Sequence, residues 1–414
     1  MGAQQSGSAT GPSTGSAKKR SNRSQGKPSE PAPESPKTNA KPKSKVQPLT
    51  RNSVRKNLPR AASVPLGTSS NGSSKIGIAR DAPKAHKVLE PGLNPGDRVV
   101  IIGDLHGMVH KTKALWRSLK DNLGEAELSA ALVVFLGDYC DRGLYVKDTL
   151  QWLVQLRRER EAKGSRTVFI LGNHEFCLLG FLGMLPAPVD EPNFLFRQTW
   201  DSESGHIGRN ERERWGGSDL DDESLNSMHL QGRRWAGPIY EKSYGSMMTF
   251  QSYGVERGDR VGLRSAMSGD HLDFLRSCPW VHDLHHPLLG RLIFVHAGLE
   301  ADGSEDCEEQ INRLKSRDGR HPMPEPLFGR DGVLHTPPQL ARMGTTVVSG
   351  HHGRVILRTH RIILDSCSGD EKCPLQALVL PECFLVSNDG TIDTKVGGSV
   401  FAPRPRRATI DGLA

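Results

Sequence analysis

The sequence predicts an α/β protein, and two observations carry that prediction. Three short apolar runs lie between residues 98 and 171, and the two stretches between them place apolar residues three or four positions apart. Short apolar runs bounded by turn residues are typical of buried strands, and a 3.6-residue spacing is typical of amphipathic helices. Strand, helix, strand, helix and strand joined by short loops favour a core with parallel pairing.

The first elements follow one another from residue 98. The apolar runs predict strands at 98–102, 131–136 and 167–171, and the amphipathic stretches predict helices at about 110–121 and 145–160. Further apolar runs predict strands at 291–295, 345–348, 355–357, 361–364, 376–380 and 384–386. The later runs are close together and have no helix between them, so we expect antiparallel pairing in a second sheet.

Composition divides the chain into three parts. Residues 1–90 are rich in Ser, Gly, Pro and Lys, and this composition predicts a disordered tail. We expect one folded domain over residues 91–390 and a loose tail over 391–414. The polar stretch at about 185–250 is too long for a simple loop, so we interpret it as an insertion that shapes the substrate cleft. No apolar run reaches 18 residues, which excludes a transmembrane helix.

The excess positive charge belongs to the first tail. Residues 1–75 contain 14 lysines and arginines but only two acidic residues, whereas the whole chain has a net charge of +8. The rest of the chain is therefore mildly acidic. A basic tail suits contact with an anionic surface; a solvated extension is the plainer interpretation, and we do not expect nucleic acid as the partner.

The start of the chain bears on localisation. Met1–Ser6 fits the myristoylation pattern, and an acylated Gly2 followed by the basic segment would provide membrane contact. An organelle transit sequence is an alternative interpretation of the same composition. Seven cysteines without CxxC spacing indicate a reducing compartment, so we expect cytoplasmic or nuclear localisation, with membrane association if Gly2 is myristoylated.

Five polar clusters follow predicted strands directly. They are Gly103–Gly107, Gly137–Gly143, Gly172–Glu175, His296–Gly298 and Gly350–Gly353. Each cluster alone is as well explained by a turn or a helix cap. In an open α/β sheet, however, the loops at the carboxyl ends of the strands converge on one crevice. We therefore expect the five clusters to meet at a single point.

The residue types at that point indicate metal ions. The candidate ligands are Asp104, His106, Asp138, Asn173, His296 and His351. Carboxylate, amide and imidazole ligands together suit Mn, Fe or Zn better than Ca or Mg. Six ligands are too many for one catalytic ion with open positions, but they suit two ions about 3.5–4 Å apart that share a carboxylate.

Four further residues complete a phosphate-cleaving site. His174 has Asp141 available to orient it, and it is suited to protonate a leaving oxygen. Arg142 and Arg330 could bind phosphate oxygens through two parallel hydrogen bonds each, with Asn173 also facing the phosphate. The alternative for each arginine is a surface ion pair. Cys140 is expected to be structural.

The motifs GDLHG, GDYCDRG, GNHE, HAG and GHH together resemble the phosphoprotein phosphatase branch of the metallo-phosphoesterase superfamily over about residues 98–390. The resemblance implies a calcineurin-like β-sandwich flanked by helices, with the inserted segment. It also implies that Asp104, His106 and Asp138 hold one metal, and that Asp138 bridges to a second one. The ligands implied for this second metal are Asn173, His296 and His351. Asp141 and His174 would form the acid pair.

Several longer sequence segments resemble one group within that branch. The segments FLGDYCDRG at 135–143, HLQGRRWAG at 229–237 and VVSGHHG at 347–353 are similar to the Rhizobiales-like phosphatases. That resemblance implies a phosphoprotein substrate and a preference for phosphotyrosine. One departure is the lack of a SAPNY-like motif, because DSCSG at 365–369 occupies its expected place.

The sequence therefore predicts a metal-dependent phosphoprotein phosphatase that hydrolyses phosphomonoesters by direct attack of a metal-bound hydroxide and prefers phosphotyrosine. One alternative is a phosphatase for phosphoserine and phosphothreonine. Another is an enzyme that cleaves dinucleoside polyphosphates or other nucleotides. A third, from a different class, is a non-catalytic scaffold that binds phosphoproteins.

Overall fold

The computed structural model describes residues 92–201, 222–303, 305–366 and 369–397, all of which lie in the second of the chain's two units, Ala79–Ala414. The tail predicted for residues 1–90 lies outside the described residues, and so does most of the tail predicted for 391–414. Within the described ranges, no helix has the length and apolar character needed to cross a membrane.

The first sheet has six strands in the order β11-β10-β9-β1-β2-β3. The strands β1, β2 and β3 pair in parallel, with Val99 opposite Leu132 and Val133 opposite Thr167. β9 runs antiparallel to β1, and β10 and β11 continue that antiparallel edge. Its strands are β1 Val99–Ile102, β2 Leu132–Phe135, β3 Thr167–Phe169, β9 Gln376–Leu380, β10 Phe384–Ser387 and β11 Ile392–Asp393.

The second sheet has five strands in the order β4-β5-β6-β8-β7. β5, β6 and β8 are parallel, and the outer strands β4 and β7 are antiparallel to their neighbours. Its strands are β4 Val281–His286, β5 Gly290–Val295, β6 Thr346–Ser349, β7 Val355–Arg358 and β8 Arg361–Leu364.

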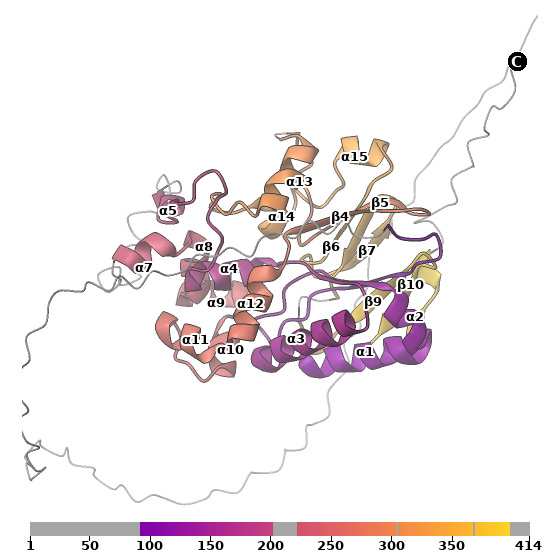
Figure 1. Ribbon diagram of the computed structural model, residues 1–414, viewed down its shortest axis with the longest axis horizontal. Coiled ribbons are helices and arrows are strands. Elements are labelled where there is room, and N and C mark those ends of the chain that lie inside the picture. Colours follow the sequence, from indigo (N-terminus) through magenta and orange to yellow (C-terminus); the bar gives the residue numbers. More distant parts are fainter. Residues whose placement is uncertain (1–91, 202–221, 304, 367–368, 398–414) are drawn as a thin grey trace, which may run out of the picture. The chain divides into compact units, whose positions relative to one another are not determined.

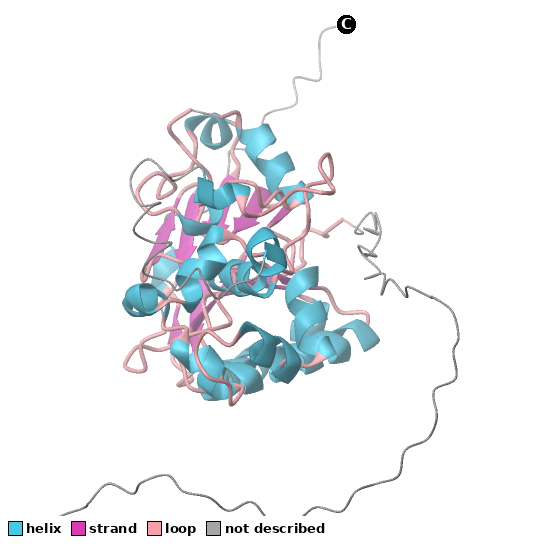
Figure 2. Ribbon diagram, turned by 90° about the vertical axis from the view of Figure 1, so that its left-hand side faces the viewer, coloured by secondary structure: helices cyan, strands magenta, loops and turns pink. Residues whose placement is uncertain are grey.

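The two sheets pack face to face, and helices cover their outer faces (Figures 1 and 2). Strand β1 illustrates why: all four residues are buried, and they alternate between two cores. Val99 and Ile101 belong to the core between the sheets, whereas Val100 and Ile102 belong to the core shared with the helices. A strand that is buried on both faces consists of apolar residues without interruption. This is the pattern from which strand β1 was predicted.

Helices α1 and α3 lie over the first sheet, and α13, α14 and α15 lie over the second (Figure 1). The predicted insertion is a group of short helices from α5 to α10, and α11 and α12 follow it before β4. The helices are α1 Val109–Leu123, α2 Glu125–Ala130, α3 Val146–Ala162, α4 Asn173–Leu182, α5 Gln198–Asp201, α7 Asp222–Ser227, α8 Leu230–Ala236, α9 Glu241–Tyr244, α10 Met247–Ser252, α11 Arg260–Ala266, α12 Gly269–Ser277, α13 Cys307–Ser316, α14 Glu325–Phe328 and α15 Pro338–Arg342, with 3₁₀ turns η1 Pro238–Tyr240 and η2 Lys395–Gly397.

The prediction of an α/β sandwich flanked by helices is confirmed, but the assignment of late strands to one antiparallel second sheet is wrong. β9 and β10 return to the first sheet beside β1, and β5, β6 and β8 are parallel. Strand β4 was not predicted, because VHDLHH has too few apolar residues to signal a strand. The boundary predicted at residue 390 falls just before β11, whose Ile392 pairs with Val386.

Candidate active site

The five polar clusters meet where the parallel strands of both sheets end. Gly103–Gly107 follows β1, Gly137–Gly143 follows β2, His296–Gly298 follows β5 and Gly350–Gly353 follows β6, while Gly172–Glu175 forms the start of α4. Backbone hydrogen bonds join the loops. The amide of His106 donates to the carbonyl of Asp138 at 2.8 Å, and the amide of Gly350 donates to the carbonyl of His296 at 2.9 Å.

The loop backbone is held in an uncommon conformation at this point. Eight non-glycine residues of the described ranges have positive φ, and five of them lie in these clusters. The five are His106, Asp138, Asp141, Arg142 and His351, with φ between 41° and 69°. Such residues cost about 1–3 kcal/mol each unless the surroundings hold them, and they gather at functional sites.

Two features hold the loop after β2. Gly137 has φ 104°, and a Cβ there would lie 2.7 Å from the backbone of Gly172 and 2.8 Å from Nδ1 of His296. The buried carboxylate of Glu175 accepts the backbone N–H groups of Asp138, Tyr139 and Cys140 at 2.8–2.9 Å. Burial raises the pKa of Glu175 to about 7, so these bonds repay part of the cost of placing a carboxylate there.

Asp138 lies at the centre of two groups of metal-ligand atoms. One group joins Asp138 to His106 and His174, and the other joins it to His296 and His351; within each, the nearest ligand atoms lie within 4.8 Å of one another. Oδ2 of Asp138 is 3.6 Å from Nε2 of His106, and Oδ1 is 3.2 Å from Nε2 of His296. The amide of His351 donates to both carboxylate oxygens of Asp104, at 3.1 and 3.2 Å.

The second group has the donor set of a cation site. Nδ1 of His296 faces the carbonyl of Leu136 at 2.7 Å, and Nε2 of His351 faces the carbonyl of Phe328 at 3.2 Å. Each of these nitrogens must carry a proton to make its bond, which directs the other ring nitrogen inward. Nε2 of His296 then lies 3.0 Å from Oδ1 of Asn173 and 3.2 Å from Nδ1 of His351. One proton cannot bridge all three atoms, but a metal ion can accept a lone pair from each.

His106 of the first group is oriented in the same way, and it faces Asp104 as well as Asp138. Nδ1 of His106 faces the carbonyl of Cys140 at 3.0 Å, so Nε2 points inward, 3.9 Å from Oδ2 of Asp104. The guanidinium of Arg142 lies 2.9 Å from this Nε2. A cationic group thus already stands at the position where a metal would meet the histidine.

The electrostatics of the centre favour added positive charge. Burial raises the pKa of Asp104 well above its usual range, and the neighbouring charges of Asp365 and Asp138 add to the effect. Burial also acts to raise the pKa of Asp138, but His174 and His296 outweigh it and hold that pKa well below its usual range. Burial lowers the pKa of His351 well below its usual value, which favours the neutral imidazole that binds metals.

A network of hydrogen bonds centred on Asp141 lies beside the metal ligands. Nδ1 of His174 is 2.6 Å from Oδ2 of Asp141, and Nε2 of His174 is 3.7 Å from Oδ2 of Asp138. The indole N–H of Trp235 donates to the same Oδ2 of Asp141 at 2.6 Å, and the hydroxyl of Thr249 donates to Oδ1. The side chains of this network are all buried, namely His174, Asp141, Trp235 and Thr249. Asp141 is therefore a fixed acceptor that orients the imidazole of His174.

Two arginines lie beside the centre. Nη2 of Arg142 is 3.3 Å from Nε2 of His174, and it donates to the carbonyl of Ser243 at the same distance. Arg330 donates to the backbone carbonyl of His351. Burial lowers the pKa of Arg330, while the charges of Asp138 and Asp104 act in the opposite direction. Both guanidiniums thus interact electrostatically with Asp104, from different loops.

The structure brings together all ten residues that the sequence singled out. Sequence reasoning missed the roles of Glu175, Trp235 and Thr249, although Glu175 stands in the motif GNHE. Trp235 and Thr249 come from α8 and α10 of the insertion, and nothing in their local sequence points to Asp141. The insertion therefore contributes to the site indirectly, because two of its side chains donate hydrogen bonds to the buried carboxylate of Asp141.

Comparison with known proteins agrees with this geometry. Residues 97–248 match the family model described as calcineurin-like phosphoesterase. A Shewanella-like protein phosphatase 2 from Arabidopsis thaliana is 32% identical over 104 residues, which cover 25% of this chain and 27% of the relative. A Shewanella-like protein phosphatase 1 from Plasmodium berghei (strain Anka) is 36% identical over 81 residues, which cover 19% and 22%.

A solved cold-active protein tyrosine phosphatase aligns over 72% of this chain and 78% of its own, with 15% identity and a TM-score of 0.40. The two sheets, their flanking helices and the family match define a calcineurin-like metallophosphoesterase fold. The matches to the curated relatives span about a quarter of those proteins' length.

Proposed function

We propose that this chain is a metal-dependent phosphoprotein phosphatase that hydrolyses phosphomonoesters. The observation that carries the proposal is the position of Nε2 of His174, which is 3.7 Å from the carboxylate shared by both metal-ligand groups. A general acid and a candidate metal centre thus face the same small volume. Two arginines beside it suit the charge of a phosphate group.

In this proposal Asp104, His106 and Asp138 hold one metal ion, and Asp138, Asn173, His296 and His351 hold the other. Two bound ions of Mn, Fe or Zn would supply Lewis acidity and a water that loses a proton near neutral pH. Arg142 and Arg330 bind the phosphate oxygens, with Asn173 close by, and fix the orientation of the ester.

The proposed acid is His174. Asp141 accepts from Nδ1 of His174, which leaves Nε2 directed at the centre. A proton at Nε2 is transferred to the ester oxygen as its bond to phosphorus breaks, so the alcohol leaves uncharged. Water supplies the fourth oxygen of the released phosphate. Cys140 takes no part, because it is buried and burial raises the pKa of its thiol well above the usual range.

The finer assignments are part of the proposal. The amino-acid sequences of residues 135–143, 229–237 and 347–353 support membership of the Rhizobiales-like group and, with it, a preference for phosphotyrosine. The curated relatives found are named Shewanella-like protein phosphatases, which supports phosphoproteins as substrates without specifying the residue.

The test is turnover of the full chain on matched peptides that carry phosphotyrosine, phosphoserine or phosphothreonine, with and without added manganese. A dinucleoside tetraphosphate in a parallel assay tests the nucleotide alternative. We expect release of phosphate from the phosphotyrosine peptide and at least a 100-fold fall in kcat for His174→Asn. Turnover equal to wild type in both His174→Asn and Asp138→Asn would refute the proposal.

The placement in the cell is also proposed. The cysteine pattern supports a cytoplasmic or nuclear protein, and the basic tail with the pattern at Met1–Ser6 supports membrane contact when Gly2 is acylated. Labelling with a myristate analogue would test this, with Gly2→Ala as the matched variant. Equal label in both chains would count against acylation at Gly2.

A further inference from the structure

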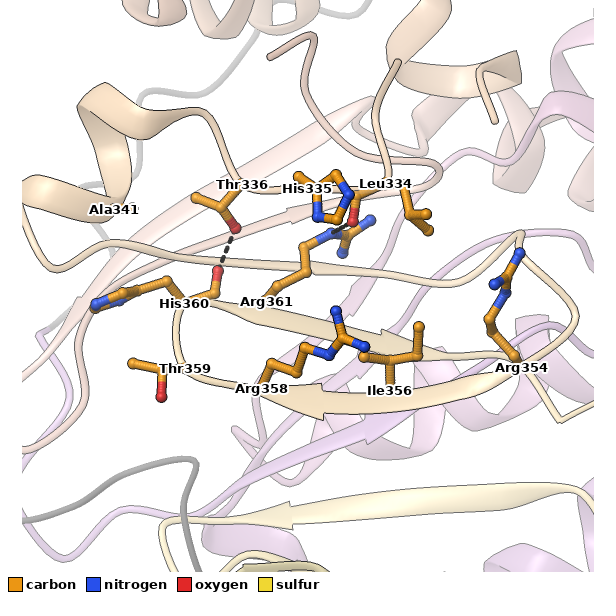
Figure 3. A pocket seen from close by; sticks show the side chains of 10 residues that line it. All are labelled: Leu334, His335, Thr336, Ala341, Arg354, Ile356, Arg358, Thr359, His360 and Arg361. Carbon is orange, nitrogen blue, oxygen red and sulfur yellow. Dashed lines mark hydrogen bonds between the residues drawn. The ribbon is translucent and has the colours of Figure 1, made fainter. Parts of the chain in front are cut away.

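A cavity of about 270 Å³ lies at the outer edge of the second sheet, away from the residues of the candidate active site. It is bounded by the β7–β8 hairpin and by the segment before α15 (Figure 3). Three arginines (Arg354, Arg358 and Arg361) and two histidines (His335 and His360) line it. Of the described residues, no aspartate or glutamate is among those lining it.

Two of these arginines face each other directly. Arg358 on β7 is the register partner of Arg361 on β8 in an antiparallel pair. Partners in such a pair have Cβ atoms about 5 Å apart on the same face of the sheet, and like charges there are destabilising. Figure 3 shows both side chains rising from the same side of the hairpin, with His335 above the guanidinium of Arg361. A bound anion would relieve this repulsion.

Arg361 is a buried cation whose hydrogen bonds all go to neutral oxygens. Its side chain donates to the carbonyls of Leu334 at 3.1 Å, Val333 at 3.1 Å and Ile362 at 2.7 Å, among others. The residue is only 4% exposed, and burial lowers the pKa of its guanidinium to about 9. Burying a charge without a counter-charge is costly, so the cavity above it is a place where a negative group is stabilised.

The size of the cavity limits what can bind. Its volume is about nine times the share of liquid volume that one water occupies, and it is slightly smaller than a typical pocket for a drug-sized ligand. A phosphate group, alone or on a small carrier, fits this space. Planar guanidiniums match the oxygens of such a group through two parallel hydrogen bonds.

The cavity floor is connected to the candidate active site. Nη2 of Arg361 donates to the carbonyl of Ala297 at 3.0 Å and to the hydroxyl of Ser349 at 2.9 Å. Ala297 follows His296 in the chain, and Ser349 lies two residues before His351. A ligand that shifts Arg361 would therefore act on the loops that carry both histidines.

We propose that this cavity is a binding site for a phosphate-type oxyanion, held by Arg358 beside the buried Arg361, with Arg354 adding positive charge at the other end of the cavity. The site is separate from the proposed catalytic centre and does not depend on its activity. The anion is either free inorganic phosphate or a phosphoryl group on a small molecule, and both present the same oxygens to the arginines.

The test is equilibrium dialysis of the full chain with radiolabelled inorganic phosphate. The double variant R354Q/R358Q is compared with R117Q, which removes an exposed arginine on α1. We expect the double variant to bind one equivalent less phosphate than wild type, and R117Q to match wild type. R358K keeps the charge but loses the paired hydrogen bonds, so we expect about ten-fold weaker binding at this site.

The loss of one equivalent is the readout, so the result holds whether or not phosphate also binds at the catalytic centre. A second arm with phosphoserine separates the two sources: tighter binding than inorganic phosphate indicates a carried phosphoryl group, and equal binding indicates the free ion. Equal phosphate stoichiometry in wild type and in R354Q/R358Q, with circular dichroism showing both folded, overturns the proposal.

Discussion

Trp235 and His174 share one oxygen of Asp141. The indole N–H and the imidazole Nδ1 each lie 2.6 Å from Oδ2 of that carboxylate, inside a fully buried cluster. Trp235 belongs to the insertion, whereas His174 lies in the first turn of α4. The orientation of His174, the proposed general acid, is therefore set partly by Trp235, which belongs to neither metal-ligand group.

The first prediction concerns this positioning. Replacing Trp235→Phe removes one hydrogen bond to a charged carboxylate, which is worth about 1.5–3 kcal/mol. We expect kcat to fall about 10- to 100-fold and KM to change little, because the residue does not contact substrate. Asp141 then has one donor fewer, so the imidazole of His174 is held less firmly in the orientation that the proposed acid needs.

Thr249→Val is the matched change on the other oxygen of Asp141, because the hydroxyl of Thr249 donates to Oδ1. It should lower kcat in the same direction. An unaltered kcat in both variants, measured on the phosphotyrosine peptide, would show that the two bonds are only structural.

The second prediction separates two adjacent histidines. His351 contributes an inward nitrogen to one metal-ligand group, whereas Nε2 of His352 lies 2.8 Å from the carbonyl of Ala297. We expect His351→Ala to lose about one equivalent of bound metal in elemental analysis of the purified chain. His352→Ala should keep its metal, because Arg361 still donates to the same carbonyl. Equal metal content in the two variants would contradict the proposed ligand set.

The third prediction is a pH dependence of stability from His229. This residue caps α8, accepting from the amide of Gln231, and burial lowers its pKa to about 3. An unfolded histidine binds its proton near pH 6.5. Between pH 3 and 6.5 the unfolded state therefore binds more protons, so the free energy of unfolding decreases as the pH falls. His229 alone should contribute a loss of about 1 kcal/mol between pH 6 and pH 5.

Urea unfolding at pH 7, 6 and 5 measures this dependence. His229→Asn keeps a capping oxygen but removes the titrating ring, so its free energy of unfolding should fall less steeply with pH than that of wild type. Parallel curves for the two chains would exclude His229 as a source of acid sensitivity. The absolute stability of the variant is not the readout, because the ring also packs on Phe176.

The fourth prediction concerns the close packing of α8 on α4. A Cβ on Gly232 would lie 2.1 Å from the backbone nitrogen of Phe181, so Gly232→Ala must push the two helices apart. Overpacking of this kind costs about 1–3 kcal/mol. We expect a lower Tm and a lower kcat together, because Trp235 lies on the same helix.

Gly269→Ala is the control for that change. A Cβ on Gly269 meets nothing within 4 Å, and the substitution reduces the entropy of the unfolded chain. Thermal unfolding should show an equal or slightly raised Tm. A Tm for Gly232→Ala as high as that of Gly269→Ala would mean that the two helices tolerate separation.

Much of the fold could be predicted because its central strands are unambiguous locally. β1 and β2 are buried on both faces, so their residues are apolar without interruption. β4 could not be predicted, since its Asp283 and His285 are polar and its pairing with β5 is what makes it a strand. The position of β9 in the first sheet is likewise decided by its pairing with β1. The local sequence of a strand does not indicate which of two sheets it joins.

By itself the sequence determined which chemical groups this protein gathers. The residues Asp104, Asp138 and His351 could be singled out because each stands in a glycine-flanked cluster after a strand, and parallel strands end at a common edge. Only the tertiary structure decided how those groups are held. Trp235 reaches Asp141 across 94 positions of the chain. Arg361 pairs with Arg358 across a hairpin, beside a cavity that no aspartate or glutamate of the described residues lines. Such contacts depend on packing between distant segments, and local sequence patterns carry no record of it.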